Sequence, residues 1–161
     1  MSAVDIARAA AAAVLDPEVP VLTIEDLGVL RDVRVDADRV TVTVTPTYSG
    51  CPAMEVIERD VETAVRAAGF DDVVVRRVLS PAWTTDWMSD AGRQKLEQYG
   101  IAPPAPHAPH GSGPVPVALS VRCPQCGSPD TRELSRFGST ACKSLWQCQA
   151  CHEPFDHFKA I

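Results

Sequence analysis

The chain has 161 residues and carries 21 Asp and Glu side chains against 15 Lys and Arg, so its formal net charge at pH 7 is −6. Residues 1–100 hold 17 acidic and 10 basic side chains, and residues 101–161 hold 4 and 5, so neither part is basic enough to bind a phosphate backbone. No apolar run approaches the roughly 18 residues that cross a bilayer. Asp5 and Arg8 interrupt the Ala-rich start, so we expect no signal peptide and place the protein in the cytoplasm.

The first predicted elements are a helix and a single helical turn. Residues 4–15 are rich in Ala, the best helix former, and Asp16 before Pro17 should end this helix because a residue before proline avoids the helical conformation. Thr23 and Asp26 have the spacing of a capping box, which predicts one helical turn there.

Two strands are predicted to follow as a hairpin. Valines alternate with mostly polar residues over 29–35, and valines alternate with threonines over 40–45, a pattern typical of half-buried strands. The polar residues 36–39 between them predict the hairpin loop.

A helix over residues 52–68 and a strand over 73–79 come next. Apolar side chains recur in the helix at helical spacing, and Gly69 stands where a glycine commonly ends a helix. Because a helix connects this strand to the one before it, we expect the two strands to be parallel within a mixed sheet.

A third helix is predicted over residues 89–99, and the chain then changes in composition. Residues 101–118 include six prolines and two glycines with no helical or strand pattern, which predicts an extended linker. The expected organisation is therefore an α+β domain over 1–100, a linker over 101–118 and a small C-terminal domain over 119–161.

Four cysteines in the C-terminal domain form two C-x-x-C pairs separated by 21 residues. The pairs are Cys123 with Cys126 and Cys148 with Cys151. This spacing supplies four thiolates to one tetrahedral metal and predicts a structural zinc ribbon, with rubredoxin-like iron left open. About 43 residues cannot bury a large core, so the metal should supply much of the folding free energy. His152 follows a ligand and could compete for the metal, whereas His107 and His110 lie in the linker.

Cys51 is the candidate functional thiol of the N-terminal domain. It precedes Pro52 at the predicted start of a helix, where free backbone N–H groups and the helix dipole should lower the pKa of a thiol. Such a thiolate ligates iron or acts as a nucleophile, and the alternative is a buried cysteine that only packs. Residues 1–100 contain no histidine, which argues against a Cys–His hydrolase; Asp16, Glu18 and Asp26 are the acidic candidates for a base or a ligand.

Three further side chains are candidates for a functional role. Cys142 lies between the two cysteine pairs and is either a packing residue or an accessory thiol. Trp83 and Trp87 lie four residues apart in a predicted loop, and we expect one to pack in the domain and the other to contact a partner.

Several motifs resemble known families. The stretches Asp16–Pro20, Asp26–Gly28 and Thr45–Pro52 resemble the iron–sulfur cluster assembly domain family, which includes SufT-like proteins. Five more stretches resemble the PaaD family of phenylacetyl-CoA epoxidase systems: Ser80–Trp87, Tyr99–Pro104, Phe137–Lys143, Cys148–Cys151 and Glu153–Lys159.

The resemblance implies a small α+β domain with a three- or four-stranded sheet, followed by a zinc ribbon. It implies an accessory or maturation factor, not an enzyme, that helps insert iron or an iron–sulfur cluster into the reductase or di-iron oxygenase component of the epoxidase. Cys51 would be the thiol that holds the transient iron or cluster. Because one thiolate cannot hold a cluster alone, a homodimer, a ligand from the client protein or Cys142 would complete the ligand set.

Two other interpretations stay open. The chain could be an integral, non-catalytic subunit of the oxygenase that serves its structure or electron transfer. Electron transfer would need iron in the ribbon, because zinc is redox-inert. A pure binding module would instead depend on Trp83 or Trp87 and not on Cys51.

Overall fold

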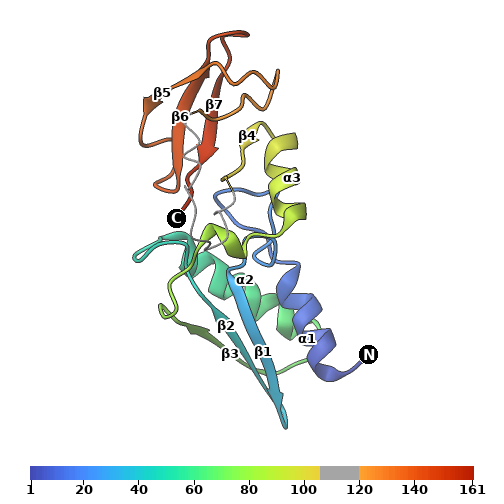
Figure 1. Cartoon of the computed structure of the whole chain (residues 1–161). Coiled ribbons are helices and arrows are strands. Elements are labelled where there is room, and N and C mark those ends of the chain that lie inside the picture. Colours follow the sequence, from blue (N-terminus) through green and yellow to red (C-terminus); the bar gives the residue numbers. More distant parts are fainter. Residues whose placement is uncertain (106–119) are drawn as a thin grey trace, which may run out of the picture. The chain divides into compact units, whose positions relative to one another are not determined.

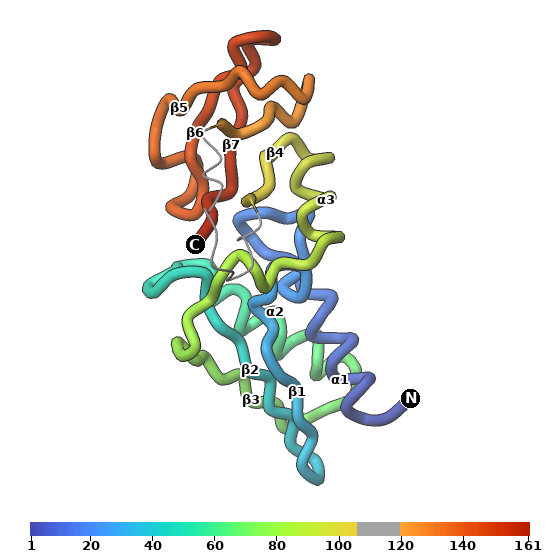
Figure 2. Tube along the Cα trace, viewed as in Figure 1, coloured from blue at the N-terminus to red at the C-terminus, as the bar shows by residue number. Residues whose placement is uncertain are grey.

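The computed structural model describes residues 1–105 and 120–161, so most of the expected Pro-rich linker, with His107 and His110, lies outside the described residues. The chain divides into two compact units, an N-terminal unit over Met1–Gly92 and a C-terminal unit over Arg93–Ile161. Figure 1 labels the elements of both units, and Figure 2 traces the path of the chain through each of them. Within the described residues, no helix is both long and apolar enough to cross a membrane.

Helix α1 spans Ala3–Ala12 and is shorter than predicted at its C-terminal end. Ser2 caps it through a reciprocal pair of hydrogen bonds with Asp5, a capping box that the sequence prediction missed. The predicted continuation to Leu15 is wrong because Leu15 instead forms a bridge with Thr23. Backbone hydrogen bonds on either side of that bridge hold the chain in an extended conformation before Pro17 is reached.

The predicted hairpin is confirmed as strands β1 (Leu30–Asp36) and β2 (Arg39–Val44), which pair antiparallel. The turn between them places Ala37 at a φ of 52°. The reciprocal hydrogen bonds predicted between Thr23 and Asp26 are also present, in a turn that leads into β1.

The predicted helix and parallel strand follow as α2 (Ala53–Ala67) and β3 (Asp72–Arg77). Strand β3 pairs parallel with β2, which completes a three-stranded sheet of order β1-β2-β3. Helices α1 and α2 pack against this sheet and against each other (Figure 1). The buried face of α2 and the buried valines of β2 form the centre of the core: Met54, Ile57, Val61, Val65, Val40, Val42 and Val44.

After β3, a 3₁₀ helix η1 (Thr85–Trp87) and helix α3 (Asp90–Gln98) follow. The segment around η1 packs tightly against the turn before β1. A side chain at Gly28, whose φ is 73°, would lie 2.5 Å from the backbone oxygen of Trp87. Glycine is therefore required there both for its conformation and for its lack of a side chain.

The C-terminal unit contains a four-stranded sheet of order β4-β7-β6-β5. Its strands are β4 (Ile101–Ala102), β5 (Thr131–Ser135), β6 (Lys143–Cys148) and β7 (Pro154–Phe158). The prediction that residues 101–118 contain no strand is wrong at its start, because β4 pairs parallel with β7. Two residues are too few to show a strand pattern, and their position follows from packing: Ala102 joins Cys123, Cys148 and Phe155 in one buried cluster.

Candidate functional sites

The four cysteines of the C-terminal unit converge on one point. Their sulfur atoms all lie within 4.8 Å of one another, and the cross-pair distances are 3.7 Å between Cys123 and Cys151 and 3.6 Å between Cys126 and Cys148. Four sulfurs at the usual Zn–S distance around a tetrahedral ion lie about 3.8 Å apart. The donor set and its spacing therefore fit a tetrahedral metal such as zinc.

Each cysteine pair is shaped by a turn that ends in a left-handed residue. Gly127 follows Cys126 with a φ of 74°, and His152 follows Cys151 with a φ of 65°. The N–H of Gly127 donates to the carbonyl of Cys123 at 2.8 Å and closes the first turn. His152 therefore provides the left-handed backbone conformation that ends the second turn. It is not part of the metal-binding group found among the described residues.

In the second turn, a backbone N–H group stabilises the thiolate of Cys148, whereas the pKa of Cys151 is raised to about 12. The N–H of Cys151 donates to the sulfur of Cys148 at 3.5 Å, and this bond is the main cause that lowers the pKa of Cys148 to about 7. A lowered pKa favours the thiolate, which is the form that binds a metal. Cys123 and Cys148 are buried, whereas Cys126 and Cys151 lie toward solvent.

Cys51 lies in the N-terminal unit, in the loop between β2 and α2. The sequence pattern predicted it at the cap of the helix, but the structure places Pro52 there and begins α2 at Ala53. The Cys51 side chain is only 7% exposed. Its sulfur is close enough to the N–H of Ala53 and the hydroxyl of Tyr48 to accept hydrogen bonds from both.

The expectation that the pKa of Cys51 is lowered is wrong. Burial raises the pKa of this thiol, and it outweighs the two hydrogen bonds, which act in the opposite direction. The carboxylates of Glu18 and Asp16 raise it further, because they repel a negative charge on the sulfur. Cys51 is therefore a shielded, neutral thiol at pH 7.

Two of the three acidic candidates, Asp16 and Asp26, have different surroundings. Asp16 is 7% exposed and accepts hydrogen bonds from the N–H groups of Glu18 and Val19 at 2.8 and 2.7 Å, which fix its carboxylate near Cys51. The Asp26 carboxylate instead accepts hydrogen bonds from the N–H of Thr23 and the hydroxyl of Ser89, so it stabilises turns.

Two groups near Cys51 were missed by the sequence prediction. Tyr48 belongs to the motif that precedes Cys51 but was given no role of its own, and Arg77 was not predicted near the thiol. Arg77 pairs with Glu58 at 2.6 Å, which is the main cause that raises the pKa of Arg77, and an electrostatic interaction with Cys51 raises it further. Only the folding of β3 beside α2 brings Arg77 within range of the thiol, so no local signal in the sequence could have found it.

The remaining candidates are mainly buried. Cys142 is 4% exposed, and its sulfur lies 2.9 Å from the hydroxyl of Thr140. Trp83 is 4% exposed and donates its indole N–H to the carbonyl of Leu27, so it is the tryptophan that packs. Trp87 is half-buried, and the central carbon of the Arg31 guanidinium lies 3.5 Å from the centroid of its ring. The contact of Trp87 with a partner stays a prediction.

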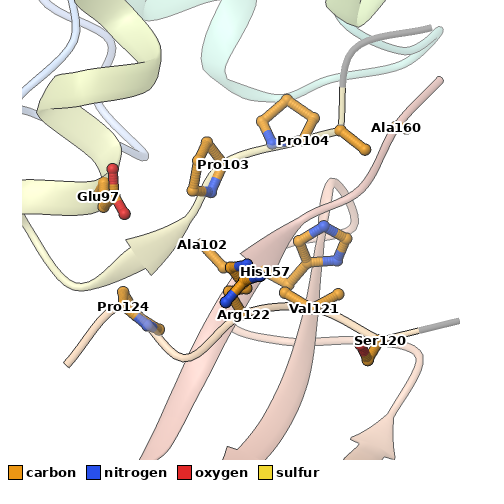
Figure 3. Close-up of a pocket in the computed structure, with 11 residues that line it drawn as sticks. Glu97, Ala102, Pro103, Pro104, Ser120, Val121, Arg122, Pro124, His157 and Ala160 are labelled. Carbon is orange, nitrogen blue, oxygen red and sulfur yellow. The ribbon is translucent and has the colours of Figure 1, made fainter. Parts of the chain in front are cut away.

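A cavity of about 600 Å³ lies within the C-terminal unit (Figure 3). The segment that carries Pro103 and Pro104 bounds one side, and the segment that carries Val121 and Arg122 bounds another. The His157 ring also lines the cavity, with its Nδ1 3.4 Å from the Ser144 hydroxyl. Burial lowers the pKa of His157 to about 4, so this ring is neutral at pH 7.

Comparisons with known proteins cover both units. Residues 6–76 match the family model of the iron–sulfur cluster assembly protein, and residues 108–159 match that of the PaaD zinc beta ribbon domain. A crystal structure of a domain of unknown function from Bacillus anthracis has a TM-score of 0.54 at 29% identity, covering 58% of this chain and 91% of that one. These matches define the class: an iron–sulfur-assembly-type α+β domain followed by a zinc ribbon.

Two curated relatives define the family more narrowly. The chain is 50% identical over 146 residues, or 91% of this chain and 86% of the relative, to an Escherichia coli protein named as a putative subunit of 1,2-phenylacetyl-CoA epoxidase. It is 40% identical over 85 residues, or 52% of this chain and 80% of the relative, to an Fe–S protein maturation auxiliary factor of Porphyromonas gingivalis. The chain belongs to the family of the Escherichia coli protein, the PaaD family of phenylacetyl-CoA epoxidase subunits.

Proposed function

We propose that this protein is a non-catalytic accessory factor that delivers iron or an iron–sulfur cluster to a phenylacetyl-CoA epoxidase system. The observation that carries the proposal is the shielded Cys51 thiol, held beside two carboxylates in a domain of the iron–sulfur assembly type. The Escherichia coli relative supports the epoxidase as the client system, and the maturation-factor relative supports the activity.

The surroundings of Cys51 suit capture and release of a cation. Binding of Fe²⁺ replaces the S–H bond with an S–Fe bond, and the displaced proton leaves to solvent. The charges of Asp16 and Glu18, which oppose a bare thiolate, favour a cation at the same place. Without the cation the thiol regains its proton, so the proton and the cation compete for the same sulfur.

The ribbon has a structural part in this proposal. Cys123, Cys126, Cys148 and Cys151 would hold zinc in a closed four-thiolate shell, which leaves no open position for chemistry. The metal would keep the small C-terminal unit folded so that it can contact the client.

The test is an anaerobic maturation assay. The purified apo-reductase component of a phenylacetyl-CoA epoxidase is incubated with ferrous iron, sulfide and this chain, and recovery of cluster absorbance and reductase activity is followed. We expect the wild-type chain and an Asp38→Asn control to accelerate recovery, whereas Cys51→Ser should not accelerate it. The same assay on the di-iron oxygenase component identifies which client is served. Acceleration by Cys51→Ser equal to that of the wild type, for both components, would refute the proposal.

The second candidate is an integral, non-catalytic subunit of the epoxidase, and the naming of the Escherichia coli relative as an epoxidase subunit favours it. A stoichiometric complex that persists through gel filtration at working enzyme concentration, with turnover that depends on this chain after maturation is complete, would support this candidate. An electron-transfer role would also require iron in the ribbon.

A further inference from the structure

The segment from β5 to β6 presents apolar side chains to solvent although it is firmly fixed. Leu134 is 46% exposed and Phe137 is 68% exposed. Neither side chain is needed to fill the core of the C-terminal unit, which is built around Cys123, Cys148 and Phe155. Exposed apolar side chains on an ordered segment can serve as contact sites for a partner.

Leu134 is turned outward by the strand itself. Strand β5 is the last strand of its sheet, and within residues 1–105 and 120–161 it pairs only with β6. The pairing register shifts between Glu133 and Ser135, which leaves Leu134 at a bulge. Bulges at sheet edges redirect side chains, and an edge strand also offers backbone groups to an extended segment.

Phe137 is held in place by its surroundings. Its N–H donates to the Ser135 hydroxyl at 3.2 Å, and the Lys159 ammonium lies 4.9 Å from the centre of its ring. The Lys159 ammonium also donates to the carbonyl of Arg136 at 3.0 Å. The next residue, Gly138, donates its N–H to the carbonyl of Lys143 at 2.7 Å. An aromatic ring fixed before binding loses little conformational entropy when a partner covers it.

The charges around these two side chains are mainly positive. Arg132 and Arg136 flank Leu134 in sequence, and Lys159 lies over Phe137. Two carboxylates are also close: Glu133 lies 3.9 Å from Arg136, and Asp156 accepts a hydrogen bond from the Ser139 hydroxyl at 3.3 Å. Carboxylates of a partner segment would therefore complement the excess of positive charge at this surface.

We propose that Leu134, Phe137 and the edge of β5 form a docking surface for an extended, acidic segment of the client protein. Apolar side chains of the segment would cover Leu134 and Phe137, its backbone would pair with β5, and its carboxylates would face Arg132, Arg136 and Lys159. This inference rests on the proposed accessory function and names the surface that selects the client.

Binding of the full zinc-loaded chain to purified reductase and oxygenase components of a phenylacetyl-CoA epoxidase tests the surface. We expect Phe137→Ser and Leu134→Ser each to weaken binding to one component at least tenfold, and Arg136→Glu to weaken it more at low than at high salt. Tyr99→Ser and Leu79→Ser are the matched controls, because both replace exposed apolar side chains elsewhere (56% and 60% exposed), and they should bind as the wild type does.

The outcomes separate this inference from the proposed function. If the Phe137 and Leu134 variants bind and mature the client normally while Cys51→Ser fails, the docking surface is wrong and the accessory function stands. If Cys51→Ser matures the client normally, the function itself fails. Absence of binding to either component, or a chain dimer that only Phe137→Ser dissociates, overturns the docking surface as proposed.

Discussion

The surroundings of Cys51 keep its thiol protonated at pH 7. Burial and the carboxylates of Asp16 and Glu18 raise its pKa, although it lies just before the positive end of α2. A shielded, protonated thiol reacts slowly with oxidants and alkylating agents, because the thiolate is the reactive form. This behaviour suits a carrier better than a nucleophilic enzyme.

Removing one of the two repelling charges should make Cys51 more reactive. We expect Glu18→Gln to increase the rate of alkylation of Cys51 by iodoacetamide at pH 8 roughly two- to threefold, the scale of one partly screened charge pair. Cys142→Ser and zinc loading restrict the reaction to Cys51, and Asp38→Asn in the hairpin turn is the charge-matched control. An unchanged rate in Glu18→Gln would show that this carboxylate does not act on the thiol.

His157 should make the C-terminal unit sensitive to acid. Its pKa is about 4 in the folded chain and 6.5 in the unfolded reference, so protons bind preferentially to the unfolded chain. The stabilisation is complete above pH 6.5 and is lost as the pH falls toward 4.

We expect the urea midpoint of the zinc-loaded protein to fall more between pH 7 and pH 5 in the wild type than in His157→Gln. Between pH 7 and pH 5, the wild type should lose about 1 kcal/mol more unfolding free energy than His157→Gln, after allowance for partial exposure of the ring. Protonation of the cysteine ligands lowers stability in both proteins and cancels in the comparison. Equal pH dependence of stability in the two proteins would contradict the lowered pKa of His157.

At the scale of the elements, the turn before β1 and the η1 segment are packed against each other through Gly28. Gly28→Ala should destabilise the N-terminal unit by about 3 kcal/mol, because the new side chain is both strained and in conflict with the Trp87 backbone. Gly69→Ala is the matched control: its φ is also positive, but nothing lies within 4 Å of the added carbon, so about 1 kcal/mol is expected. Urea unfolding followed at the Trp83 indole signal measures the loss of unfolding free energy in both variants. Equal losses of unfolding free energy in the two variants would show that the close approach of Gly28 to the Trp87 backbone is unimportant.

Local patterns in the sequence predicted most of the N-terminal elements. The Val–Thr alternation predicted β2, helical spacing predicted α2, and the crossover rule predicted the parallel pairing of β2 with β3. The helix predicted to reach Leu15 stops early because Leu15 pairs with Thr23, a tertiary contact that helix propensity does not describe. Strand β4 was missed for the same reason, since two residues carry no periodicity.

The sites were predictable to different degrees. Covalent spacing alone brings Cys123 near Cys126 and Cys148 near Cys151, so the metal-binding geometry was accessible from the sequence. The pKa of Cys51 was predicted in the wrong direction, because its direction depends on burial and on carboxylates 33 and 35 residues away in the chain. The surface around Leu134 and Phe137 was not predicted, since only the edge position of β5 exposes it.

At the scale of the whole molecule, the two units should respond independently to loss of the metal. We expect about one zinc per wild-type chain and none in Cys148→Ser, with about 10 kcal/mol or more of folding free energy lost from the C-terminal unit. The tryptophans report on each unit separately: the Trp146 indole N–H bonds the Ser144 hydroxyl in the ribbon, and that of Trp83 bonds Leu27 in the N-terminal unit.

In NMR spectra, chelation or Cys148→Ser should remove the folded Trp146 indole signal and leave that of Trp83 in place. Cys142→Ser is the control that keeps both signals and the zinc. A folded Trp146 signal that survives complete metal removal would contradict the structural role of the ribbon metal.

Metal and sulfide analysis of anaerobically purified protein shows whether Cys51 binds iron. Wild-type chain and Cys51→Ser are loaded with ferrous iron and sulfide under the same conditions and separated from unbound ions. We expect about one zinc in both proteins and iron, with or without sulfide, that is bound by the wild type and lost in Cys51→Ser. Equal iron in the two proteins, or zinc alone in both, would contradict a carrier built on Cys51.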